Sequence, residues 1–87
     1  MIGIVATLKA QPGKGAELYK ALQSLATVVL EKEKGCHQYE PFVTSDAPDT
    51  IVVIEQYEDA AASQEHRDSA HYQSAVATLS VLLAAAP

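Results

Sequence analysis

The stretch Ile51–Tyr72, with the sequence IVVIEQYEDAAASQEHRDSAHY, decides the fold. It opens with β-branched residues that are typical of a strand ending at Tyr57, and it turns at Glu58-Asp59. An alanine-rich helix that carries His66 follows, and a second helix starts at Ser69. Polar and aromatic side chains therefore gather where a strand meets two helices. We expect the pocket of so small a chain at this junction.

The preceding half of the chain supplies two more strands and a long helix. The run from Ile2 to Leu8 is rich in β-branched residues and predicts a strand with both faces buried. Ala16 to Lys34 places leucines and a valine on one face at helical spacing, and Gly35 is expected to end this helix in the left-handed conformation. Cys36 to Thr44 predicts a second strand, in which Pro41 indicates an edge or a bulge.

The third strand, Thr50 to Tyr57, forms a hairpin with the second. Asp59 is expected to cap a helix from Ala60 to Arg67, and Ser69 to cap the last helix. One face of that last helix is apolar and consists of Tyr72, Val76, Leu79 and Leu83.

The resulting order is β-α-β-β-α-α in a single domain, residues 1–87. A βαβ unit places the first two strands parallel, with the long helix crossing one face, and the hairpin adds the third strand antiparallel. This pattern predicts an α+β fold of the ferredoxin-like split β-α-β type. If the helices cover one face only, a second subunit can cover the other by sheet-to-sheet packing, so we expect a homodimer.

Composition and charge exclude several classes of protein. Of the 87 residues, 48% are hydrophobic, which is typical of a globular chain. Eleven acidic residues against six basic ones give a net charge of -5, and the basic residues form no patch, so nucleic acid is not an expected partner. Cys36 is the only cysteine. No apolar run approaches ~18 residues and no leader is visible, so we expect a cytoplasmic protein without a membrane partner.

Several runs of residues, taken in order, resemble the antibiotic biosynthesis monooxygenase domain family. They are the Pro-Gly-Lys turn at 12–14, Gly35-Cys36-x-x-Tyr39-Glu40, and Ile54–Asp59 followed by Ala61, His66, Ser69, His71 and Tyr72. The resemblance implies a dimeric α+β barrel. It also implies an activity found in some members, the cofactor-independent oxidation of quinols, phenols or polyketide anthrones with molecular oxygen. Other members have no established activity or degrade heme.

The chain departs from this family in two ways. Relatives commonly continue past the last helix into a fourth strand, whereas this chain ends at Pro87, so we expect three strands or an edge open to another segment. Position Tyr57 is frequently Trp in the family.

Heme is not an expected cofactor. Heme-degrading relatives supply a histidine from the last long helix, and residues 73–87 contain none, which disfavours heme.

His66 is the first candidate for a catalytic residue, because imidazole can take a proton from a phenol or quinol near neutral pH. The alternative is a packing role with a hydrogen bond to a backbone carbonyl. Glu55 shares a strand face with Tyr57 and could orient His66 or bind a substrate hydroxyl, or it could be a structural partner of a basic group or backbone amide. Tyr39, Tyr57 and Tyr72 are expected to line the pocket.

No metal or other cofactor is expected from the sequence. His37 and Cys36 are neighbours on a strand and point to opposite faces. His66 and His71 are five residues apart across a helix break, which is not the i, i+4 spacing of a helical zinc pair. Cys36 is expected to be a small buried side chain rather than a nucleophile.

The first functional hypothesis is therefore a small cofactorless monooxygenase that acts on a quinol or polycyclic phenol, with His66 as the base and Glu55 orienting it. The second is a non-catalytic dimeric module that binds a small apolar ligand or a partner segment through a free sheet edge. The third is a small isomerase or lyase. Measuring whether the product gains one oxygen atom separates the first hypothesis from the third.

Overall fold

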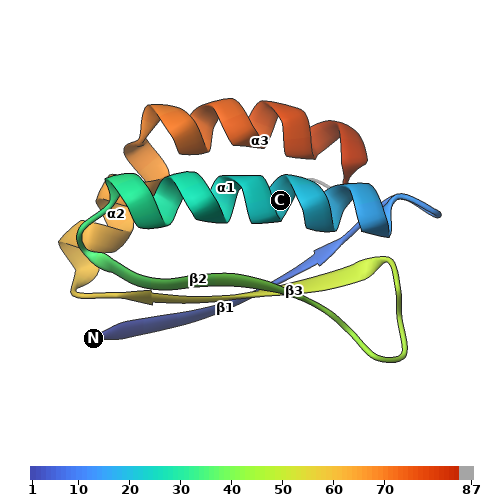
Figure 1. Cartoon of the computed structure of the whole chain (residues 1–87), viewed down its shortest axis with the longest axis horizontal. Helices are drawn as coiled ribbons and strands as arrows, with labels where there is room; N and C mark the ends of the chain where they lie inside the picture. Colours follow the sequence, from blue (N-terminus) through green and yellow to red (C-terminus); the bar gives the residue numbers. More distant parts are fainter. Residues whose placement is uncertain (85–87) are drawn as a thin grey trace.

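The computed structural model describes residues 1–84 and has the predicted order of elements (Figure 1). The elements are β1 (Ile2–Lys9), α1 (Gly15–Lys32), β2 (Cys36–Val43), β3 (Thr50–Tyr57), α2 (Ala60–Asp68) and α3 (Ala70–Leu82). The strands form one antiparallel sheet in the order β1-β3-β2. β1 and β2 are thus parallel to each other and separated by β3, as a split β-α-β unit requires. No helix within residues 1–84 is long and apolar enough to cross a lipid bilayer.

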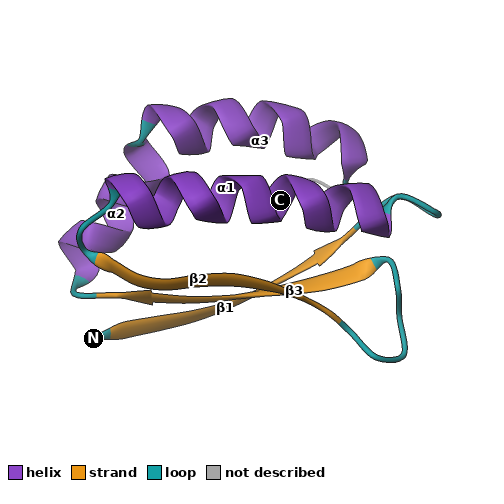
Figure 2. Ribbon diagram, viewed as in Figure 1, coloured by secondary structure: helices purple, strands orange, loops and turns teal. Residues whose placement is uncertain are grey.

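The helices lie on one face of the sheet (Figure 2). α1 and α3 lie side by side above the strands, and α2 lies at one end, next to the ends of β2 and β3. The predicted apolar face of α1 is buried, with Leu18 and Val29 fully enclosed. From β3, the alternate residues Ile51, Val53, Glu55 and Tyr57 point toward the helices and are buried. The core therefore lies between this sheet face and the helices.

The other sheet face is uncovered in the single chain. Along β1 the burial alternates residue by residue, and Val5 is 70% exposed. Val5 pairs across the sheet with Ile54, and Phe42 on the far side of β3 pairs with Val52, which gives this face an apolar centre. The prediction that both faces of β1 are buried is therefore wrong for one chain, because no helix among the described residues crosses the outer face.

The start of α1 is fixed by a residue from the hairpin loop. The two carboxylate oxygens of Asp49 accept hydrogen bonds from the backbone amides of Gly13 at 3.0 Å and Gly15 at 2.9 Å. Gly15 must be glycine here, because an added Cβ would lie 2.2 Å from the carbonyl oxygen of Pro48. Gly13 has a φ of 80°, the left-handed conformation that glycine adopts without strain.

The end of α1 differs from the prediction. The helix ends at Lys32, with Glu33 as its C-cap, and no residue other than Gly13 has a positive φ within residues 1–84. Gly35 is therefore not a left-handed cap, and that expectation is wrong. Its role is a close approach, since a Cβ at this position would lie 2.6 Å from the Cβ of Ala62 on α2.

The two edges of the sheet bear on the expectations for Pro41 and for a fourth strand. Pro41 lies on β2, which is an edge strand as predicted, while the irregular register falls between Cys36 and Gln38. After α3, Leu83 forms a single antiparallel bridge with Ala10 at the end of β1. The rest of the segment where a fourth strand could follow, residues 85–87, lies outside the described residues.

Candidate active site

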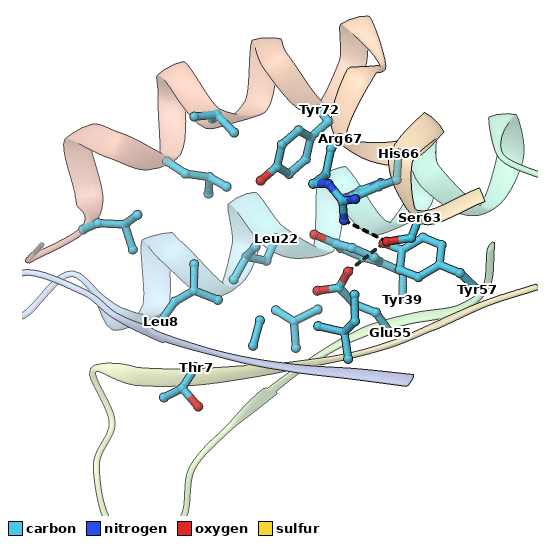
Figure 3. Close-up of a pocket in the computed structure, with 16 residues that line it drawn as sticks. Thr7, Leu8, Leu22, Tyr39, Glu55, Tyr57, Ser63, His66, Arg67 and Tyr72 are labelled. Carbon is cyan, nitrogen blue, oxygen red and sulfur yellow. Dashed lines mark hydrogen bonds between the residues drawn. The ribbon is translucent and has the colours of Figure 1, made fainter. Parts of the chain in front are cut away.

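A cavity of about 370 Å³ lies between the inner face of the sheet and the helices α2 and α3. This volume is within the range of about 300–1,000 Å³ that small-molecule sites occupy. Its polar lining residues gather at the α2 end, and Leu8 and Leu22 lie toward the opposite, apolar end (Figure 3). Thr7 points to the other side of the sheet in the same view. The cavity thus has one polar end and one apolar end.

His66 projects from α2 at the polar end and is only 4% exposed. Three tyrosine rings surround the imidazole, each from a different element. The ring centroids of Tyr39 on β2, Tyr57 on β3 and Tyr72 on α3 lie 5.2, 5.5 and 4.6 Å from that of His66. The four residues selected from the sequence are therefore neighbours in space, and all of them line the cavity.

Glu33 holds the His66 ring, and the sequence reasoning did not identify this residue. Its carboxylate lies 2.9 and 3.1 Å from His66 Nδ1, and 2.5 Å from His71 Nε2. A carboxylate can only accept, so both histidines donate to it. Gly35, two residues after Glu33, lies close to Ala62 of α2, so the connection after α1 runs next to the helix that carries His66. The expectation that His66 bonds to a backbone carbonyl is therefore wrong, because its partner is the Glu33 carboxylate.

The second ring nitrogen of His66 faces the cavity. Among residues 1–84 the ring bonds to protein only through Nδ1. Among residues 1–84, every side-chain nitrogen or oxygen that is inaccessible to solvent has a hydrogen-bond partner. Since Nε2 of His66 has no such partner, it must be accessible, and we infer that it opens onto the cavity that His66 lines. Because Nδ1 carries the donated proton, the neutral ring presents Nε2 as an acceptor.

Glu55 lies at the floor of the cavity and is bonded to Tyr57. The Tyr57 hydroxyl donates a hydrogen bond of 2.6 Å to Glu55 Oε1. The expectation that Glu55 pairs with a basic group or a backbone amide is therefore wrong, because its hydrogen-bond partner is the Tyr57 hydroxyl. The expectation that Glu55 orients His66 is also wrong, because Glu33 does so. Burial raises the pKa of Glu55, although the Tyr57 hydrogen bond and the nearby His66 partly oppose this shift.

Comparison with known proteins agrees with this architecture. Residues 1–78 match the family described as antibiotic biosynthesis monooxygenase. The chain belongs to the antibiotic biosynthesis monooxygenase family. It is 35% identical over 82 residues to the Escherichia coli K12 protein named "Probable quinol monooxygenase YgiN", covering 82% of this chain and 77% of that protein. It is also 35% identical over 85 residues to YcnE of Bacillus subtilis strain 168, covering 98% and 88%.

Solved structures of similar proteins have the same fold. A crystal structure from Caulobacter crescentus CB15 superposes with a TM-score of 0.90 at 33% identity, covering 97% of this chain and 79% of that chain. Rv0793 from Mycobacterium tuberculosis superposes with a TM-score of 0.83 at 28% identity, covering 95% and 83%. The ferredoxin-like arrangement of this family member is thus shared along nearly its whole length.

In this antibiotic biosynthesis monooxygenase family member, Tyr39 and Tyr57 keep their phenolic protons at neutral pH. Burial raises the pKa of both Tyr39 and Tyr57 above the ordinary value of a phenol. The hydroxyls of Tyr39 and Tyr72 have no protein partner among the described residues, so they are open to the cavity. Figure 3 shows the Tyr72 hydroxyl directed into it. The hydroxyls of Tyr39 and Tyr72 can therefore donate hydrogen bonds to a bound molecule, and the raised pKa of Tyr39 prevents it from acting as a base.

Two further polar residues that line the cavity were not found from the sequence. Arg67 Nη1 donates to Ser63 Oγ at 2.8 Å, and Arg67 lines the cavity although it is exposed. Cys36 lies near the site, where burial and the charge of Glu33 raise its thiol pKa to about 11. A thiol with this pKa stays protonated, which fits the expected role as a buried apolar side chain.

Proposed function

We propose that this protein is a cofactor-independent monooxygenase that oxidises a quinol or polycyclic phenol with molecular oxygen. The observation that carries the proposal is His66, whose Nδ1 is held by Glu33 while Nε2 faces a cavity walled by three tyrosines. Membership of the antibiotic biosynthesis monooxygenase family and the name of the YgiN relative support the same chemistry.

The proposed first step is removal of a proton from the bound substrate by His66 Nε2. Glu33 then stabilises the imidazolium through the charge-assisted bond at Nδ1, in the way a carboxylate orients a histidine base elsewhere. The resulting substrate anion is electron-rich enough to reduce oxygen directly. For an anthrone, one oxygen atom forms the new carbonyl at the methylene carbon, and the second leaves as water with the two protons removed from that carbon. No bound redox group takes part.

The shape of the cavity supports a flat, mostly apolar substrate with hydroxyl groups at one end. The ring face can pack against Leu8, Leu22 and the aliphatic residues of α3. The hydroxyl end would then meet Tyr39, Tyr72 and His66. A site of this kind excludes water and brings the reacting proton to a fixed base, which are the contributions that a cofactorless oxygenase needs from its protein.

We further propose that the outer sheet face packs against a second copy of this chain to form a homodimer. The face has an apolar centre at Val5, Phe42, Val52 and Ile54, and Val5 is 70% exposed in the single chain. Val5→Asp should give monomers in analytical ultracentrifugation. Val81→Asp provides a matched control, because Val81 is 72% exposed on α3, and it should leave the dimer intact. A wild-type monomer would refute this part.

The function is tested by oxygen uptake with a reduced naphthoquinol or an anthrone, using chelator-treated protein that absorbance shows to be free of flavin and heme. We expect uptake above autoxidation in the wild type and its loss in His66→Ala. The matched control is His37→Ala, since His37 is an exposed histidine outside the cavity. Uptake no faster than autoxidation across a panel of such substrates would favour the alternative, a non-catalytic dimeric module that holds an apolar ligand.

A further inference from the structure

Glu33, His66 and His71 form a cluster between two hollows of the molecule. His66 lines the cavity described above. His71, on the other side of Glu33, lines a groove between α1 and α3 that also contains Leu25, Val28 and Ala75 and has a volume of about 360 Å³. The side chains of His66, Glu33 and His71 are 5%, 10% and 17% exposed. The cluster is thus nearly buried on the cavity side and reachable from the groove.

We propose that this cluster binds one divalent transition-metal ion of the zinc type, through a carboxylate oxygen of Glu33, Nδ1 of His66 and Nε2 of His71. These three ligand atoms lie within 4.8 Å of one another. Two imidazole nitrogens and one carboxylate oxygen are ligands that zinc accepts, and three protein ligands leave a fourth position for water. The groove at His71 provides an entry path to that position.

The side chains must rearrange to hold the ion, because the Glu33 oxygen has to move away from both nitrogens while the two nitrogens, which lie within 4.8 Å of each other, have to end about 3.3 Å apart. In a tetrahedral site with bonds of about 2.0–2.1 Å, the ligand atoms lie about 3.3 Å apart. The Glu33 oxygen lies 2.9 Å from His66 Nδ1 and 2.5 Å from His71 Nε2, so these contacts must widen by less than about 1 Å. Glu33 is the cap residue just beyond α1, where a side chain can shift without disturbing a helix. The ion takes the place of the two N–H groups that point at the carboxylate, and in each neutral imidazole the proton moves to the other ring nitrogen.

A metal ion bound at this site would prevent His66 from acting as the proposed base. An imidazole that coordinates an ion through Nδ1 and stays neutral carries its proton on Nε2. His66 would then present a donor rather than an acceptor to the cavity. The bound ion should therefore inhibit oxygenation, a consequence that rests on the proposed function, whereas the existence of the site does not.

The binding test uses the full chain after chelator treatment and titrates it with Co²⁺ and with Zn²⁺. We expect one ion per chain, with the intense visible absorption of tetrahedral cobalt. His71→Ala should weaken binding by more than about 100-fold, since even partners outside the ligand shell change metal affinity by about 10- to 100-fold. His37→Ala should bind like the wild type, because this exposed histidine lies outside the cluster.

Glu33→Gln provides a second variant that keeps the size of the side chain and removes the charged ligand, and circular dichroism checks that each variant is folded. Binding that is absent in the wild type, or equal in the folded His71→Ala and His37→Ala proteins, would overturn the proposal. The inhibition arm is separate. Cluster-dependent binding without oxygenase activity would support the site and reject only the proposed function. If metal binding left a measured oxygenase activity unchanged, the proposed inhibition through His66 would be refuted.

Discussion

Replacing Tyr57 by Phe tests how the buried carboxyl of the cavity is held. The Tyr57 side chain is fully buried, and its hydroxyl donates a bond of 2.6 Å to Glu55 Oε1. Phe fills almost the same volume, so the variant removes the donor with little change in packing. A hydrogen bond to a charged group contributes about 1.5–3 kcal/mol, and one between neutral groups about 0.5–1.5 kcal/mol. The cost of the substitution should therefore depend on the ionisation of Glu55.

The direction of this dependence follows from the pKa of Glu55. Burial raises the folded-state pKa above the ordinary value of 4.5. The folded chain therefore binds this proton more tightly than the unfolded chain. The associated stability is fully present below pH 4.5 and is lost as the pH rises through the folded pKa. Because the Tyr57 bond opposes the shift, Tyr57→Phe should raise the folded pKa further and extend the loss to higher pH.

The assay is urea denaturation from about pH 4 to about pH 9, compared with wild type at each pH. We expect Tyr57→Phe to be less stable by about 0.5–1.5 kcal/mol at the acidic end and by about 1.5–3 kcal/mol at the basic end. Tyr39→Phe is the matched control, because its hydroxyl lines the same cavity without a bond to Glu55. A cost for Tyr57→Phe that is constant with pH, or that Tyr39→Phe reproduces, would refute the reasoning.

Three other substitutions or treatments test the packing around the site. Gly35→Ala should destabilise the fold by about 1–3 kcal/mol, because the new Cβ would lie 2.6 Å from that of Ala62, and thermal denaturation of the double variant with Ala62→Gly should show recovery. Asp49→Ala should lower stability by about 1–2 kcal/mol through loss of its two bonds at the start of α1, whereas Asp46→Ala, at an exposed loop position, should be near neutral in urea denaturation. Cys36, with a pKa of about 11, should resist alkylation at about pH 8 until urea unfolds the chain, and rapid labelling of the native protein would contradict its burial.

The fold could be predicted from the sequence because its signals are local. The residues at helical spacing, Leu18, Leu22, Leu25 and Val29, do form the buried face of α1. Asp59 and Ser69 do cap α2 and α3, accepting from the amides of Ala62 at 2.8 Å and Tyr72 at 3.2 Å. Each of these features is set by residues within one or two helical turns, which is the range over which sequence patterns are informative.

The network around His66 could not be predicted in full, because it depends on contacts between distant segments. Glu33 is 33 residues away from His66 in sequence, and no local pattern links it to a helix that begins at Ala60. The close approach of Gly35 to Ala62 has no local signature that separates it from a left-handed cap. The spacing of His66 and His71 was a poor guide for the same reason, since the carboxylate between them comes from another element.

The roles of the tyrosines and of His66 as base remain predictions. The structure gathers them at one end of a cavity, but packing alone also produces aromatic clusters of this kind. What distinguishes the chemical hypothesis is the open Nε2 atom of His66, which a purely structural histidine does not need.

The most direct test of the central claim is the fate of isotopically labelled oxygen with an anthrone as substrate. The metal-free protein is incubated under ¹⁸O₂, and the product is analysed by mass spectrometry against a reaction without protein. We predict one labelled oxygen atom in the quinone product, formed faster than in the protein-free reaction by the wild type and by His37→Ala, but not by His66→Ala. Product formation at the protein-free rate in all samples, or equal acceleration by His66→Ala, would contradict the account.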